Sequence, residues 1–206
     1  MADADYEHSV FFNCPFDDEY KALSDAIIFA IHDCGYIARS ARESRDGSQV
    51  RIDKICNIIA ECKFGIHDIS RTELDETNDL PRFNMPFELG LFLGAKRFGA
   101  EEQKHKNCLI LDTERYRFGR FISDIAGQDP SAHDNDPDEA IRQVRDWLRS
   151  ATPISIKMPG ATEMARRYAA FRAALPGMCA SLQLEDDRLT FNEYAMIVEE
   201  WLKAHP

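Results

Sequence analysis

The stretch HSVFFNCPFDDEYKALSDAIIFAIHDCG, residues 8–35, has the pattern of a buried strand followed directly by a helix. Its first apolar run ends at Pro15, which cannot donate a hydrogen bond to a sheet. Acidic residues then open a segment with apolar side chains at helical spacing, and Gly35 ends that segment. Because parallel strands need helical crossovers between them, this strand and helix predict the first unit of a parallel α/β sheet.

The same alternation continues along the chain. The expected strands cover 8–16, 36–40, 64–70, 106–113 and 153–157, and the helices between them cover 17–35, 47–63, 84–99 and 139–150. Ser48 is expected to cap the helix at 47–63. Repeated alternation of this kind predicts right-handed βαβ units. We therefore expect a flavodoxin-like, doubly wound, mostly parallel five-stranded sheet with helices on both faces.

Two more helices are expected near the end of the chain, at 161–175 and 190–204, with Thr190 as the N-cap of the second. The expected division is an N-terminal arm at 1–7, an α/β domain at 8–157, and a C-terminal helical extension at 158–206 packed on the same domain. The aromatic residues of this extension are typical of core packing or of contacts in a homo-oligomer.

Composition excludes several classes of protein. The chain has 206 residues, 44% of them hydrophobic, and a net charge of −11, which disfavours general binding to nucleic acids. Its apolar runs are too short to span a membrane, and its first residues lack the features of a signal peptide. None of the six cysteines forms a C-x2-C pair, which argues against zinc. We expect a cytoplasmic protein with reduced thiols, no metal and no resident cofactor.

Candidate functional residues gather where the predicted strands end. In parallel sheets, ligands bind beyond the carboxyl ends of the strands. The candidates are Asn13 after the first strand, Arg39, Ser40 and Arg42 after the second, Asp68 and Ser70 after the third, and Asn84 and Glu88 on the helix that follows. The second strand is also followed by Arg45 and Arg51, which complete a local arginine cluster. These residues predict one polar rim along the carboxyl edge of the sheet.

Glu88 is unusual because it stands in an apolar run, PRFNMPFELGLFLGAKRFG at 81–99. A buried carboxylate is unfavourable unless it is paired or neutralised. One interpretation is a glutamate near the start of a helix capped by Asn84, stabilised by the helix dipole. The other is a carboxylate in a partly apolar cleft, where its pKa can be tuned and it can act as a nucleophile or general base.

Asp68 and the arginines also have two interpretations each. Asp68 either caps a loop at the end of its strand or acts together with Glu88 across the sheet edge. The arginine cluster is either a solvated surface or a phosphate site, because guanidinium groups suit phosphate geometry. The polar segment 71–83, between Asp68 and the helix of Glu88, is long enough to act as a lid.

Three of these stretches together resemble a known family. RFNMPFELG at 82–90 is similar to the R-x-N-x-x-F-E-L-G signature of TIR-like predicted nucleotide-binding domains, which are related to nucleoside 2-deoxyribosyltransferases. FFNCPF at 11–16 looks like the first strand of that superfamily, and HDIS at 67–70 resembles its third strand. The resemblance covers about residues 8–125, in the expected order, and leaves the C-terminal helices outside.

The resemblance implies that Glu88 is the catalytic carboxylate acting at C1′ of a sugar, on the N-glycosidic bond of NAD, a nucleotide or a nucleoside. Asp68 would orient the base or sugar, and Asn84 would bond a ribose hydroxyl or cap the helix. Phe11 matches a position often held by a substrate-contacting tyrosine. Arg82 stands where the transferases carry an aspartate, which moves the likeness towards the TIR-like branch.

Two other functions fit the same pattern. A non-catalytic nucleotide sensor or TIR-type protein-interaction module would use the same fold and the same arginines. A phosphoacceptor receiver would also have a doubly wound sheet, with acids at 17–18, Asp68 and Lys157 as its site. The receiver pattern leaves the helix of Glu88 unexplained, so the glycosidic-bond enzyme is the leading hypothesis, with a small-molecule nucleotide as its ligand.

Overall fold

Five parallel strands form the centre of the computed structural model, which describes residues 4–72, 82–154 and 156–206. The strands are β1 (Ser9–Asn13), β2 (Ile37–Arg39), β3 (Phe64–Asp68), β4 (Asn107–Asp112) and β5 (Ser131–Ala132). Their order across the sheet is β2-β1-β3-β4-β5, and every neighbouring pair is parallel. This is the flavodoxin-like order, so the predicted fold is confirmed.

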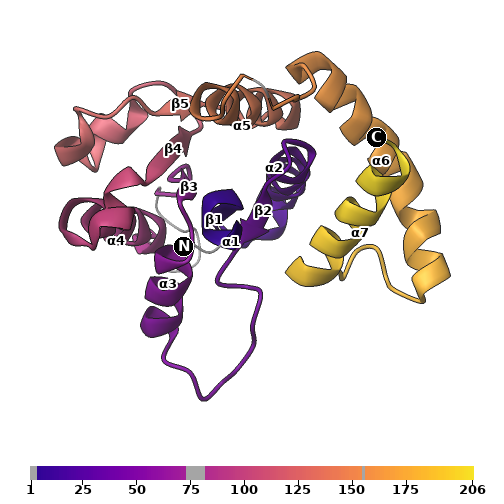
Figure 1. Ribbon diagram of the computed structural model, residues 1–206, viewed down its shortest axis with the longest axis horizontal. Coiled ribbons are helices and arrows are strands. Elements are labelled where there is room, and N and C mark those ends of the chain that lie inside the picture. Colours follow the sequence, from indigo (N-terminus) through magenta and orange to yellow (C-terminus); the bar gives the residue numbers. More distant parts are fainter. Residues whose placement is uncertain (1–3, 73–81, 155) are drawn as a thin grey trace.

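Helices cover both faces of the sheet (Figure 1). α2 (Lys21–Asp33) and α5 (Pro137–Ala151) share a core with Val10 and Phe12 of β1. α3 (Arg51–Ala60) and α4 (Asn84–Phe98) pack on the opposite face, where Phe11 and Phe92 meet. Because side chains alternate between the two faces of a strand, adjacent residues of β1 serve the two cores.

The two long C-terminal helices, α6 (Ala161–Leu182) and α7 (Phe191–Ala204), pack against the outer side of α2 (Figure 1). The Phe29 ring of α2 lies 5.4 Å from that of Phe171 and 5.9 Å from that of Trp201. α2 is therefore buried between the sheet and these helices, which explains why it is apolar on nearly every side. Thr190 caps α7 through a capping box with Glu193, as predicted.

The fifth strand is not where the sequence predicted it. β5 is formed by Ser131 and Ala132, which pair with Leu111 and Asp112 of β4. The described residues within 153–157 belong to no strand, and the Ile154 side chain is 89% exposed. These residues come after α5 in the chain. The position beside β4 at the edge of the sheet is already occupied by β5, so a strand at 153–157 would have no neighbour to pair with there. The receiver hypothesis thereby loses the strand that was to carry its lysine.

Several element ends also differ from the prediction. α2 begins late because Asp18–Tyr20 form a 3-10 turn, whose N-cap Asp17 accepts a hydrogen bond from the Tyr20 amide. α3 begins at Arg51 after Val50, which makes no side-chain cap. The prediction that Ser48 caps this helix was wrong, since Ser48 donates to Asp46 instead.

The remaining elements are short. They are α1 (Ala4–His8) and 3-10 turns at Glu101–His105, Arg117–Arg120 and Ser123–Ile125. α1 lies within the predicted N-terminal arm, and its Tyr6 is buried and donates to the Glu102 carbonyl. All six cysteines are free thiols. Among the described helices, none has the length and apolar character needed to cross a bilayer.

Candidate functional site

Asp68 lies at the carboxyl end of β3 and is completely buried. Its Oδ2 accepts a 2.6 Å hydrogen bond from the Tyr20 hydroxyl and lies 3.0 Å from His133 Nε2. Its Oδ1 accepts from the Ser70 amide at 2.8 Å. Burial alone would raise the pKa of Asp68, but the contacts from His133, Ser70 and Tyr20 outweigh it and lower the pKa. Asp68 is therefore an ionised, fully partnered carboxylate.

His133 belongs to this site, although sequence reasoning missed it. It follows β5 directly and is completely buried. Its Nδ1 accepts a hydrogen bond from the Asn135 amide at 3.0 Å, and its Nε2 faces Asp68. Its position directly after a strand of the sheet could have identified His133 as a candidate. The two residues of that strand, Ser131 and Ala132, carry no apolar pattern, so the sequence did not predict a strand there.

Arg117 connects the loops after β3 and β4 through hydrogen bonds. Its Nε donates to Asp112 Oδ1 at 2.7 Å, and its Nη2 donates to the carbonyls of Ile69 and Ser70 at 3.0 and 2.8 Å. The buried guanidinium thus joins the end of β4 to the loop after β3. Such charge-assisted bonds hold the two loops in a fixed relation, which keeps the Asp68 site rigid.

Glu88 is 5% exposed and lies in the second turn of α4. Within the part of the chain that the structure describes, its carboxylate makes no hydrogen bond and no ion pair. Burial raises its pKa from 4.5 to about 7, an effect that the nearby Arg51 partly offsets. The carboxylate is therefore largely removed from water, without the partners that Asp68 has.

The start of α4 differs from the prediction that Asn84 is its N-cap. Phe83 precedes the helix and accepts a hydrogen bond from the Phe87 amide, while Asn84 is the first helical residue and is exposed. Glu88 accordingly lies one residue deeper in the helix than predicted, beyond the first turn where the dipole acts most strongly. The proposed lid at 71–83 falls mostly outside the described residues.

Cys14 links the two carboxylates electrostatically. Its thiol is buried after β1, and burial raises its pKa well above the usual range. The charges of Asp68 and Glu88 raise the pKa further, while that of Arg42 lowers it. Among the described residues, no hydrogen bond or ion pair joins Asp68, Glu88 and Arg42 to one another.

Asn13 and Phe11 are both buried and are engaged in contacts within the protein. Asn13 is buried at the end of β1, and its Nδ2 donates to the Met85 carbonyl at 2.9 Å and lies 3.1 Å from His67 Nδ1. Asn13 therefore fixes the first turn of α4, the helix whose second turn carries Glu88. Phe11 is completely buried, packed with Phe92 between the sheet and its helices, so it offers no surface to a substrate.

Arg39 and Ser40 are also engaged within the protein. Arg39 forms a bidentate pair with Glu43, with bonds of 2.9 and 2.8 Å, and a second ion pair with Glu61 at 2.9 Å. Two carboxylates already neutralise this guanidinium, so Arg39 does not provide the free cation that a phosphate site needs. Ser40 is buried, and its hydroxyl accepts from the Arg42 amide at 3.3 Å, which shapes the turn after β2.

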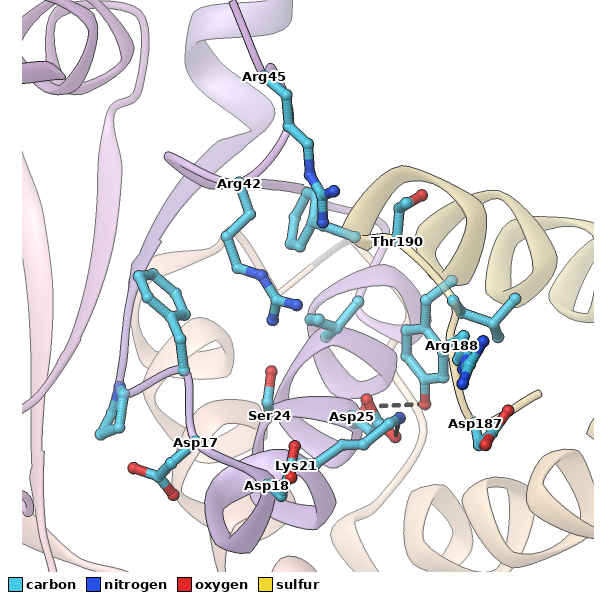
Figure 2. Close-up of a pocket in the computed structure, with 16 residues that line it drawn as sticks. Asp17, Asp18, Lys21, Ser24, Asp25, Arg42, Arg45, Asp187, Arg188 and Thr190 are labelled. Carbon is cyan, nitrogen blue, oxygen red and sulfur yellow. Dashed lines mark hydrogen bonds and ion pairs between the residues drawn. The ribbon is translucent and has the colours of Figure 1, made fainter. Parts of the chain in front are cut away.

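Two adjoining cavities, of about 300 and 400 Å³, open beside this turn. Figure 2 shows the smaller one, into which Arg42 and Arg45 reach from the segment after β2 towards Thr190 at the start of α7. The Arg42 guanidinium lies 5.3 Å from the centre of the Phe16 ring. Both cavities share five lining residues, which are Phe16, Arg42, Arg45, Thr190 and Phe191.

Comparison with known proteins assigns no relative, since no family model, curated protein or solved structure matches the chain. Within residues 4–72, 82–154 and 156–206, no group of three His, Cys, Asp or Glu side chains is placed to hold a metal ion.

We expect Glu88→Gln to stabilise the protein at alkaline pH. The native Glu88 keeps its proton between pH 4.5 and about 7, where the unfolded chain has lost it, so wild-type stability falls as the pH rises through this range. Glutamine removes this penalty, and the gain in unfolding free energy reaches up to about 3 kcal/mol at about pH 8. Urea unfolding of both proteins at several pH values measures it, with Glu200→Gln as the exposed control. An equal difference at about pH 4 and about pH 8 would contradict the burial of a charged Glu88.

Proposed function

We propose that this protein binds a nucleotide and cleaves or transfers its N-glycosidic bond, as in NAD, through the carboxylate of Glu88. The observation that carries the proposal is a buried Glu88 without a partner among the described residues, at the carboxyl edge of a parallel sheet. Leaving a carboxylate in this state is destabilising, and such groups cluster at functional sites. The likeness of RFNMPFELG to the TIR-like signature supports the same role.

The chemistry suits this carboxylate. Breaking an N-glycosidic bond develops positive charge on C1′ and the ring oxygen of the sugar, and a nearby carboxylate stabilises or captures that charge. Because its surroundings are apolar, the ionised Glu88 interacts strongly with a developing cation. The base leaves with the bonding electrons, and water or an acceptor base completes the hydrolysis or transfer.

Asp68 has a different part in this proposal. Its oxygens are already occupied by Tyr20, His133 and the Ser70 amide, and it is completely buried. We assign it to positioning: it joins the loop after β3 to Tyr20 and to His133, which follows β5. Asn13 acts in the same way on the first turn of α4.

A non-catalytic nucleotide sensor is the second candidate. Glu88 is not among the residues that line the two cavities beside Arg42, so a nucleotide could bind there without reaching the carboxylate. Calorimetric titration with NAD, together with an assay for released nicotinamide, separates the two functions. Binding without turnover supports the sensor, whereas turnover that depends on Glu88 supports the enzyme.

A further inference from the structure

The larger of the two cavities, about 400 Å³, is built from two distant parts of the chain. One wall is the segment that joins β2 to α3, including Arg42 and Arg45. The other is the start of α7, where Thr190 and Phe191 belong to the C-terminal helices. The cavity therefore lies at the carboxyl end of β2, between the α/β sheet and the helices outside it.

Positive charge predominates in this cavity. Among the described residues that line it, the ionisable ones are Arg42, Arg45, Arg51, Lys54 and Asp46. The single acid, Asp46, is already bonded to Ser48, and Lys54 donates to the Ser44 carbonyl. The whole chain has 36 acidic and 25 basic residues, so a lining with four cations and one acid runs against the overall composition. Such a concentration of positive charge attracts anions.

Arg42, Arg45 and Arg51 in this lining also differ from most arginines of the described chain in their ion pairing. Others form ion pairs, such as Arg39 with Glu43, Arg117 with Asp112 and Arg167 with Asp33.

Arg42, Arg45 and Arg51, in contrast, have no carboxylate within ion-pair distance among the described residues. Like charges that converge without partners repel one another, and a bound anion removes that repulsion.

We infer that this cavity is a phosphate subsite, and that the ligand is a phosphorylated nucleotide and not a free nucleoside. The nucleotide part of this inference rests on the proposed function. Arg51 lines the cavity and is the first residue of α3, which packs beside α4, the helix that carries Glu88. A guanidinium group can donate two parallel hydrogen bonds to two oxygens of one phosphate. Several arginines in one cavity therefore suit a mono- or diphosphate group.

The test is calorimetric titration of the full chain with ADP, adenosine and inorganic pyrophosphate. We expect ADP to bind, pyrophosphate to compete with it, and adenosine to bind about tenfold more weakly or worse, since it lacks the charged contacts. Arg45→Ala should weaken ADP binding by about tenfold and leave adenosine unchanged. The matched control is Arg97→Ala, an exposed arginine outside the cavity, which should bind ADP as wild type does.

Three results would each overturn the proposed subsite. They are equal affinities for ADP and adenosine, an unchanged ADP affinity in Arg45→Ala, and no binding of ADP. Circular dichroism of the variants checks that they are folded. The affinity for ADP and the release of base are separate measurements, so failure of the subsite is distinguishable from failure of the proposed function. Normal ADP binding without turnover in the wild type would refute the enzyme and leave the subsite standing.

Discussion

Glu88→Gln is expected to lose nearly all release of nicotinamide from NAD, or of the base from the nucleotide that proves to be the substrate. Glutamine keeps the size and shape of glutamate but cannot carry the negative charge that stabilises a cationic sugar. We expect turnover to fall on the order of a thousandfold, the upper end of the loss when one group that stabilises transition-state charge is removed. Chromatographic measurement of released base under saturating substrate gives the comparison.

The control for this experiment is Glu200→Gln, which makes the same chemical change at an exposed position of α7. It should release base at the wild-type rate. Since Glu88→Gln is expected to be more stable than wild type, a loss of turnover cannot be attributed to unfolding. Equal turnover by wild type and Glu88→Gln would remove Glu88 from the chemistry.

Asp68→Ala is expected to destabilise the protein by about 3 to 5 kcal/mol, the usual loss when one partner of a buried charged network is removed. Alanine leaves the Tyr20 hydroxyl and the Ser70 amide without their acceptor in the interior, and it removes the carboxylate that lies 3.0 Å from His133 Nε2. Each buried donor without a partner is unfavourable. Urea unfolding near neutral pH, followed by circular dichroism, measures this loss.

The control is Asp53→Ala, at an exposed position in the first turn of α3, which should change stability far less. Asp68→Asn keeps an acceptor oxygen without the charge and should fall between alanine and wild type. The pKa of Asp68 is lowered, so its contribution to stability is present near neutral pH and is lost as the carboxylate takes up a proton in acid. A stable Asp68→Ala protein would show that the network is not holding this edge together.

The fold could be predicted from sequence because its elements follow local patterns. α2 is apolar nearly all round, since it is buried between the sheet and α7, and the first four strands are short apolar runs with clear ends. β5 could not be predicted, because the two residues Ser131 and Ala132 pair only at the edge of the sheet. The apolar alternation at 153–157 was the stronger signal, and it was misleading.

The candidate site was predictable only in part, for a related reason. Glu88 and Asp68 follow from the rule that parallel sheets place function at their carboxyl edge. The pairing of Arg39 with Glu43 and Glu61 depends on side-chain geometry that spacing does not reveal. The contribution of Thr190 to the cavity depends on how the C-terminal helices pack, which no local pattern contains.

The central claim is that an ionised Glu88, held in an apolar site, drives the cleavage. The most direct test is the pH dependence of nicotinamide release from NAD by the wild-type protein at limiting substrate, where the rate reports groups of the free enzyme. Because burial raises the pKa of Glu88 to about 7, the rate should climb about tenfold per pH unit below that value and level off above it. A rate that is flat across this range, or the absence of release at every pH, would contradict the claim.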